Sequence, residues 1–349
     1  MKGYAFLSKG QAGWVEKDRP HASAAAAVVR PLMVSPCTSD VHNVEFGYVE
    51  PGRILGHEGV GEVVEVGELV RDFAPGDIVA IPAVTPDWST PLSQKGVPQH
   101  FAGPMTGNVI SNRIDGLLAE YALIPNADAN LTPIPKGVSW EAAVMATDMM
   151  TTGLYGAELA DVQFGDTVVV LGIGPVGLMS VAGARLRGAG RIIAIGSRPN
   201  CVEAAKFYGA TDIVNYKEGD VVKQVFALTH KQGADRCIIA GGGDDALNQA
   251  LSMVRYGGTI GNVNYFTTTG NLEISNPRWG FGMSNKTIRC GLTGGGQARI
   301  GAMLELVRYG RIDPTVLITH RYQGFDQIPE AFRAMTDKPR DLIKTCVTL

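Results

Sequence analysis

The hydrophobic pattern changes character near residue 152, and this change divides the chain into two predicted regions. In the first region, short β-like apolar runs alternate with turns such as Pro75-Gly76-Asp77. These runs occupy residues 25–30, 60–66 and 77–81. The pattern predicts a compact, mostly β region.

From about residue 152, short apolar runs alternate with amphipathic segments. Strands are predicted at residues 168–171, 191–195, 212–215, 236–240, 259–265 and 286–290. Helices are predicted at residues 175–187, 199–208, 219–230 and 244–255. Such alternation is typical of an α/β protein with a doubly wound parallel sheet.

The last part of the chain changes pattern again. Residues 297–309 predict another amphipathic helix, and residues 316–349 predict short strands and a helix. We expect this tail to rejoin the β region. The expected domains are residues 1–151 with 295–349, and residues 152–294.

A glycine turn follows the buried strand at residues 168–171. It has the form Gly172-x-Gly174-x-x-Gly177, with Pro175 and Val176 at the start of the next helix. These glycines permit a tight turn, close approach to a pyrophosphate and close helix packing. The helix N-terminus would direct backbone N–H groups at the phosphates. Because the chain contains 44 glycines, an ordinary turn between core elements is the alternative.

The next predicted strand ends at Gly196-Ser197-Arg198, about 20 residues after the glycine turn. A carboxylate at this place would bind the 2′-hydroxyl of NAD and repel a 2′-phosphate. A hydroxyl and a guanidinium can instead bind the phosphate. We therefore expect NADP(H), and we expect Gly196→Asp to shift preference towards NAD. The alternative for Arg198 is a solvated loop charge.

Composition limits the class of protein. The chain has 349 residues, 45% of them hydrophobic and 19% charged, which is typical of a globular protein. A net charge of −3 gives no indication of nucleic-acid or membrane partners. The five cysteines are scattered without a C-x-x-C pair, and the N-terminus lacks the apolar core of a signal peptide. We expect a cytoplasmic protein with reduced thiols.

Two residues of the β region, and one at its end, are candidates for chemistry. Cys37, His57 and Asp148 offer a thiolate, an imidazole and a carboxylate, which are donors that zinc prefers. Their spacing alone does not reveal a metal site. A buried structural cysteine and a hydrogen-bonded histidine remain the alternatives.

The segment Gly56-His57-Glu58-x-x-Gly61-x5-Gly67-x-x-Val70 resembles the zinc signature of the medium-chain alcohol dehydrogenases. The chain is most similar to the tetrameric NADP-dependent secondary alcohol dehydrogenases of the isopropanol dehydrogenase type. The similarity runs from end to end and includes the motifs VSPCTSDVH, ILGHEGVGEVVEVG, DMMTTG, LGIGPVGLMSVAGA, GSRP, YGATDIVNY and KPRDLIK.

This resemblance implies a GroES-like, mostly β catalytic domain and a Rossmann cofactor domain. It implies that Cys37, His57 and Asp148 bind one catalytic zinc, with Glu58 able to ligate the metal when no substrate is bound. Ser39 and His42 would carry a proton from the alcohol to water. Residues 82–115 contain no cysteine, so no structural zinc is expected. The implied reaction is reversible oxidation of secondary alcohols to ketones.

The resemblance also assigns residues to cofactor and substrate. Tyr216 would close over the adenosine phosphate, and Asn264 and Tyr265 would line the nicotinamide side. The substrate pocket would include Asn108, Leu292, Phe281 and Met283. The last two correspond to residues that reach a neighbouring subunit in a homotetramer.

One substitution bears on the substrate. Asn108 stands where the resembled branch has a tryptophan, which is expected to open the pocket to larger ketones. Two other functional hypotheses remain: a non-catalytic NADPH-binding protein on the same fold, and a zinc-free quinone or enone reductase.

Overall fold

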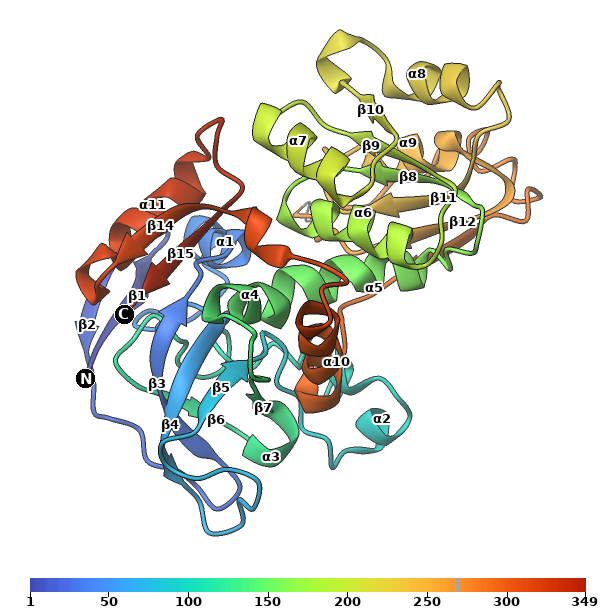
Figure 1. Ribbon diagram of the computed structural model, residues 1–349. Coiled ribbons are helices and arrows are strands. Elements are labelled where there is room, and N and C mark those ends of the chain that lie inside the picture. The colour runs from blue at the N-terminus through green and yellow to red at the C-terminus, as the bar shows by residue number, and fades with distance from the viewer. Residues whose placement is uncertain (268–269) are drawn as a thin grey trace. The chain divides into compact units, whose positions relative to one another are not determined.

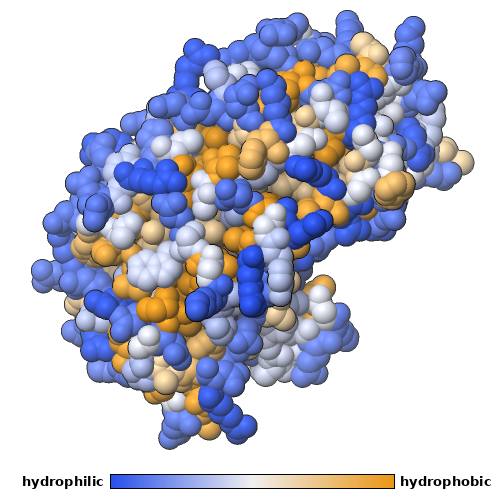
Figure 2. Space-filling model, viewed as in Figure 1, coloured by the Kyte–Doolittle hydropathy of each residue, from blue (hydrophilic) through white to orange (hydrophobic). Residues whose placement is uncertain are grey.

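The computed structural model describes residues 1–267 and 270–349. The chain forms two compact units, one of Met1–Thr151 with Thr293–Leu349 and the other of Thr152–Leu292. In the view of Figure 2, hydrophilic residues cover much of the visible surface of each unit, with smaller hydrophobic areas between them. No helix among the described residues is long and apolar enough to cross a membrane.

The first unit is built on a seven-stranded sheet and a separate antiparallel pair. The pair is β1 (Lys2–Ser8) with β2 (Gln11–Glu16). The sheet has the order β14-β15-β3-β4-β5-β7, and β6 pairs with β3. Its strands are β3 (Ala27–Val34), β4 (Gly59–Val66), β5 (Ile78–Ile81), β6 (Ala122–Ile124), β7 (Thr132–Pro133), β14 (Ile318–Gln323) and β15 (Lys344–Thr348).

Short helices complete this unit (Figure 1). They are α1 (Thr38–Phe46), α2 (Pro91–Gln94), α3 (Ala127–Asn130), α4 (Trp140–Met145), α10 (Gly296–Arg308) and α11 (Ile328–Asp337), with 3-10 turns at Pro98–His100, Pro314–Leu317 and Phe325–Gln327. A π-helical turn, Ala146–Met150, joins α4 to α5 (Thr151–Leu159). The C-terminal strand β15 pairs with β3, so the last residues belong to the same sheet as the early strands.

The second unit is a six-stranded sheet in the order β10-β9-β8-β11-β12-β13, with every pairing parallel. Its strands are β8 (Thr167–Leu171), β9 (Arg191–Ile195), β10 (Asp212–Val214), β11 (Ala234–Ile239), β12 (Val254–Asn262) and β13 (Thr287–Cys290). The order reverses direction between β8 and β11, which is the Rossmann arrangement. The predicted doubly wound sheet is confirmed.

Helices cover both faces of this sheet (Figure 1). Helices α6 (Pro175–Leu186) and α7 (Pro199–Tyr208) lie on one face, and α8 (Val221–Leu228) and α9 (Ala246–Met253) lie on the other. A 3-10 turn, Tyr216–Glu218, follows β10. The central strands are buried on both faces, so their sequences are continuous apolar runs rather than alternating ones.

Several predicted elements have different bounds. The helix predicted at 244–255, for example, is α9 and ends at Met253, so residues 254 and 255 belong to β12. The strand predicted at 259–265 begins earlier, directly after α9, and ends at Asn262. The side chain of Asn262 accepts from Asn264 N at 3.3 Å and donates to Asn264 O at 3.0 Å. Because these bonds occupy the backbone groups of Asn264, the chain turns there instead of extending the ladder. Asn264 and Tyr265 therefore follow the strand and are not part of it.

Candidate metal and dinucleotide sites

A buried carboxylate determines the position of Cys37 at the start of α1. Asp40 Oδ2 accepts a hydrogen bond from Cys37 N at 3.0 Å, and Oδ1 accepts from Gly56 N at 2.9 Å. Ser111 Oγ donates to the same Oδ1 at 3.0 Å. Burial raises the pKa of Asp40, but the charge of His57 and hydrogen bonds from His57, Gly56 N and Cys37 N bring it below its usual value. The ionised carboxylate thus joins α1 to the turn before β4.

The same carboxylate orients the imidazole of His57. Nδ1 of His57 lies 3.3 Å from Asp40 Oδ1, and Nε2 lies 3.6 Å from Asp148 Oδ2. Burial lowers the pKa of His57, but the two carboxylates raise it well above its usual value. Because Asp40 engages Nδ1, Nε2 is the nitrogen directed at Asp148 and available as a ligand.

Asp148 comes from the π-helical turn. This turn places one more residue in the helical loop than an α-helix does, and such turns often occur at functional sites. The backbone oxygen of Thr147 accepts from Ala83 N at 3.2 Å, which attaches the turn to the segment after β5. Asp148 Oδ2 lies 3.8 Å from Cys37 Sγ.

Four candidate ligands converge. One donor atom from each of Cys37, His57, Glu58 and Asp148 lies within 4.8 Å of the others, and all but the half-buried Asp148 are buried. Burial raises the pKa of the Cys37 thiol, but the opposing effects of Lys344 and His57 are larger and bring this pKa down to about 7. A thiolate, an imidazole and two carboxylates in this spacing fit a zinc ion.

The two carboxylate oxygens of Glu58 have different partners. Lys344 Nζ donates to Glu58 Oε1 at 2.7 Å and to Pro36 O at 3.0 Å, and both charged side chains are almost completely buried. Oε2 is buried and has no hydrogen-bond partner among the described residues. Burial raises the pKa of Glu58 well above its usual value, against the opposing charge of Lys344. A buried carboxylate oxygen without a partner, on a residue of the ligand cluster, is compatible with a cation near Glu58.

The two predicted relay residues lie on α1 beside this cluster. Ser39 is exposed, and its Oγ lies 3.3 Å from His57 Nε2. His42 is half-buried, one helical turn further on, with its ring 5.6 Å from that of Phe46. Burial lowers the pKa of His42. Within the described residues no hydrogen bond joins Ser39 to His42, so a relay between them needs a bridging water or a rotamer change.

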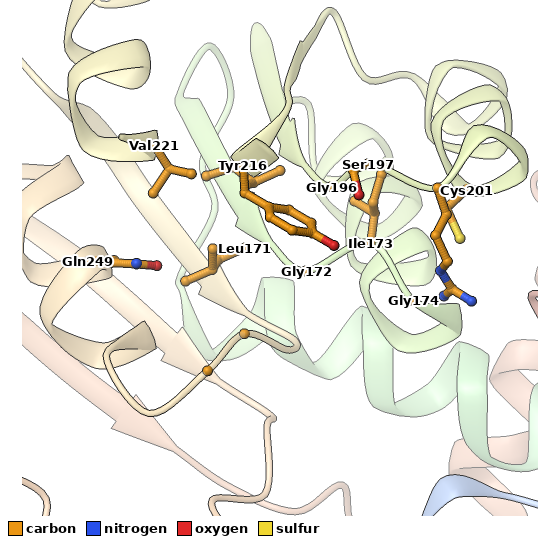
Figure 3. Close-up of a pocket in the computed structure, with 14 residues that line it drawn as sticks. Leu171, Gly172, Ile173, Gly174, Gly196, Ser197, Cys201, Tyr216, Val221 and Gln249 are labelled. Carbon is orange, nitrogen blue, oxygen red and sulfur yellow. The ribbon is translucent and has the colours of Figure 1, made fainter. Parts of the chain in front are cut away.

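In the second unit, a cavity of about 440 Å³ lies at the carboxyl ends of the central strands. Figure 3 shows the Tyr216 ring and the Ser197 side chain around it, with the glycine turn below. The lining residues include Gly172, Ile173, Gly174, Gly196, Ser197, Arg198, Cys201, Tyr216, Gly242, Gly243 and Gln249. The crevice beside the point where strand order reverses is where this fold binds dinucleotides.

The three glycines of the turn differ in how much space a side chain would have at each position. Gly172 has φ of +88°, and a Cβ there would lie 2.7 Å from the backbone of Gly241. A Cβ on Gly177 would overlap the carbonyl oxygen of Gly172. At Gly174, the residue before α6, a Cβ would meet nothing within 4 Å. That open space at a helix N-terminus is the cradle that a pyrophosphate would fill.

The remaining predicted residues lie elsewhere. Pro175 and Val176 begin α6 but do not line the cavity. Asn108 belongs to the first unit, where it is half-buried, and Leu292 belongs to the second. Tyr265, Phe281 and Met283 are 51%, 69% and 85% exposed.

Sequence reasoning did not identify Lys344, Gln249 or the pair Gly242-Gly243. Lys344 had a detectable signal, because it interrupts the apolar run LIKTCV, and a lysine there must be paired if the strand is buried. The two glycines follow β11 at the carboxyl edge of the sheet, which is the position of a ligand-binding loop. Gln249 lies within α9 and carries no local signal.

Family models match most of the chain. Residues 23–136 match the alcohol dehydrogenase GroES-like domain, and residues 175–308 match the zinc-binding dehydrogenase domain. The two matched regions together contain Cys37, His57, Glu58 and most of the residues that line the cavity, and Asp148 lies between the two regions.

Comparison with individual proteins identifies the same family as the family models. NADP-dependent isopropanol dehydrogenases from Thermoanaerobacter brockii and Clostridium beijerinckii are each 55% identical to this chain, with 100% of both chains covered. Among solved structures, alcohol dehydrogenase TADH from Thermus sp. ATN1 is 30% identical with a TM-score of 0.85, covering 100% of this chain and 99% of its own. Zinc dependent alcohol dehydrogenase 2 from Streptococcus pneumonia is 28% identical with a TM-score of 0.90, covering 100% and 98%.

Proposed function

Because the chain belongs to the zinc-dependent medium-chain alcohol dehydrogenases, in the branch of the NADP-dependent isopropanol dehydrogenases, we propose that it reversibly oxidises secondary alcohols to ketones with NADP. It is an oxidoreductase that acts on CH–OH donors. The observation that carries the proposal is the convergence of Cys37, His57, Glu58 and Asp148 within 4.8 Å. A catalytic zinc needs three protein ligands and one further position for substrate, and this set would supply both if Glu58 is displaced.

Cys37, His57 and Asp148 would hold the catalytic zinc, and Glu58 would approach it when substrate is absent. The metal would supply Lewis-acid polarisation of the substrate oxygen. Asp40 holds the His57 ring by its Nδ1 and so presents Nε2 to the ligand cluster. Ser39, exposed beside Nε2, would accept the alcohol proton, and His42 would pass it to solvent.

The cavity in the second unit would hold NADP. The open space at Gly174 and the start of α6 would receive the pyrophosphate, which is favoured by the helix dipole. Ser197 and Arg198 would bind the 2′-phosphate, and the Tyr216 ring would cover the adenosine end. Asn264 and Tyr265 would lie on the nicotinamide side.

We propose one zinc per chain, a homotetrameric assembly and a cytoplasmic location. The single zinc is supported by the absence of cysteine from residues 82–115, since a structural lobe needs a set of thiolates. All five cysteines are unpaired, which fits a reducing compartment. Exposed Phe281 and Met283 are candidates for contact with a neighbouring subunit.

The substrate pocket would include Asn108, Leu292, Phe281 and Met283. With asparagine at position 108 in place of an indole, we expect longer or aryl ketones to be accepted. A screen of ketones with NADPH tests this. Much higher activity on acetone and propan-2-ol than on longer or aryl compounds would refute the enlarged pocket.

Metal analysis tests the central proposal. We expect about one zinc per chain, loss of activity in a chelator and recovery on adding zinc. A metal-free preparation with full activity would instead support a zinc-free reductase. A preparation that binds NADPH but reduces no carbonyl compound, with or without zinc, would support a non-catalytic role.

A further inference from the structure

Ile173 occupies the space that a side chain on Gly196 would need. Gly196 follows β9, and Ile173 lies between the first two glycines of the turn after β8. A Cβ on Gly196 would overlap Cγ1 of Ile173 and lie 2.6 Å from its Cδ1. Ile173 is only 4% exposed. Because it is β-branched, its χ1 rotation is restricted, and it cannot leave the space freely.

The backbone itself does not require glycine at position 196. Gly196 does not have a positive φ. Gly172, by contrast, has φ of +88°, and a Cβ there would also lie too close to backbone atoms. A residue with a side chain could therefore adopt the Gly196 conformation. What opposes it is a neighbouring side chain, which substitution can remove.

Both residues line the cavity that also contains Ser197, Arg198 and Tyr216, and Figure 3 shows them next to each other. In this fold the residue at the end of the second strand meets the adenine ribose. A carboxylate there binds the 2′-hydroxyl of NAD. The same carboxylate would repel a 2′-phosphate.

We propose that Ile173 is a specificity-determining residue, which keeps position 196 without a side chain and so keeps a carboxylate away from the 2′-phosphate site. This inference rests on the proposed use of NADP. It revises the expectation that Gly196→Asp alone changes cofactor preference, because the new carboxylate needs room that Ile173 occupies.

Cofactor binding to the zinc-loaded full chain tests the proposal. Dissociation constants for NAD⁺ and NADP⁺ are measured for wild type, Gly196→Asp, Ile173→Ala and the double variant. We expect the double variant to bind NAD⁺ about tenfold more tightly than Gly196→Asp does, since the two sites are in contact and their effects are not additive. Additive effects on NAD⁺ binding would overturn the proposal.

A second measurement needs no cofactor. Gly196→Ala should lower the thermal midpoint of the unliganded protein, and adding Ile173→Ala should recover part of the loss. Gly174→Ala is the matched control, because its Cβ would meet nothing within 4 Å and its φ is −71°. Equal losses for Gly196→Ala and Gly174→Ala, or no recovery in the double variant, would refute the steric role of Ile173. If that recovery is seen but wild type prefers NAD⁺, the proposed cofactor is wrong and the steric coupling stands.

Discussion

Lys344 and Glu58 show how single residues determine the buried polar part of the first unit. Their side chains are 1% and 0% exposed, and Nζ lies 2.7 Å from Oε1. Removing charge from one partner of such a pair leaves the other buried and uncompensated, which costs more than the pair itself contributes. Substitution of either residue is therefore expected to destabilise the fold unless the other residue is changed as well.

We expect Lys344→Met to lower the free energy of unfolding of the zinc-free protein by about 3–5 kcal/mol, because Glu58 stays buried without its cation. Urea unfolding measures this. The double variant Lys344→Met/Glu58→Gln should regain much of the loss. Lys206→Met is the control, since Lys206 pairs with Glu203 at 2.8 Å on the surface and such pairs contribute little. Equal losses in the two single lysine variants would contradict this account.

Asp40 acts on the metal ligands without being one. We expect Asp40→Asn to weaken zinc binding by about 10- to 100-fold, because asparagine has a single acceptor oxygen and cannot accept from both Cys37 N and His57 Nδ1. Competition with a chromophoric chelator measures the affinity. Asp77→Asn is the matched control, since Asp77 accepts from Ala74 N at 2.8 Å in an exposed turn. Unchanged zinc affinity in Asp40→Asn would mean that His57 is oriented by other groups.

At the scale of elements, one guanidinium links the short edge strand β10 to its neighbours, in addition to the backbone ladder with β9. Nε and Nη2 of Arg191, on β9, each donate to Asp212 on β10 at 2.8 Å, and Nη1 donates to Leu228 O at the end of α8. One side chain thus connects two strands and a helix. Hydrogen bonds from Arg191 hold the pKa of Asp212 below its usual value, against the effect of burial.

This pair predicts a pH dependence. A carboxylate with a lowered pKa contributes stability above its unfolded pKa, and that contribution is lost as pH falls through the folded value. Asp212→Asn should therefore be less stable than wild type at neutral pH by at most about 1 kcal/mol, because the pair is partly exposed to solvent. The difference should close below the usual aspartate pKa of 3.8. Thermal midpoints across this range test it, and a gap independent of pH would contradict it.

At the scale of the whole molecule, the second unit exposes apolar side chains that a partner could cover. Phe281 is 69% exposed and Met283 is 85% exposed. Large exposed apolar residues close together in sequence are typical of association surfaces. They support association of this unit with another copy of the chain.

We expect light scattering to give about four times the chain mass of 37.0 kDa. The double variant Phe281→Asp/Met283→Asp should give a smaller species, because charge at a buried contact opposes association. Phe164→Asp is the control, since Phe164 is 93% exposed elsewhere in the second unit. A wild-type monomer would refute the tetramer, and an intact tetramer in the double variant would place the contact elsewhere.

The doubly wound sheet, the glycine turn and the family could all be predicted from the sequence. Strand periodicity and turn glycines are local properties, so they can be read from neighbouring residues. The predicted end of β12 was wrong because Asn262 ends that strand through its own side chain. Cys37, His57 and Asp148 were candidate zinc ligands because of their residue types, but their spacing along the chain did not show that they lie close together.

Which distant groups share a buried environment depends on the tertiary structure. Lys344 reaches Glu58 because β15 joins the sheet beside β3, which in turn pairs with β4. Ile173 reaches the space at Gly196 because β8 and β9 are adjacent and parallel. Such contacts depend on strand order and packing, which no local pattern encodes, and burial then makes each of them energetically significant.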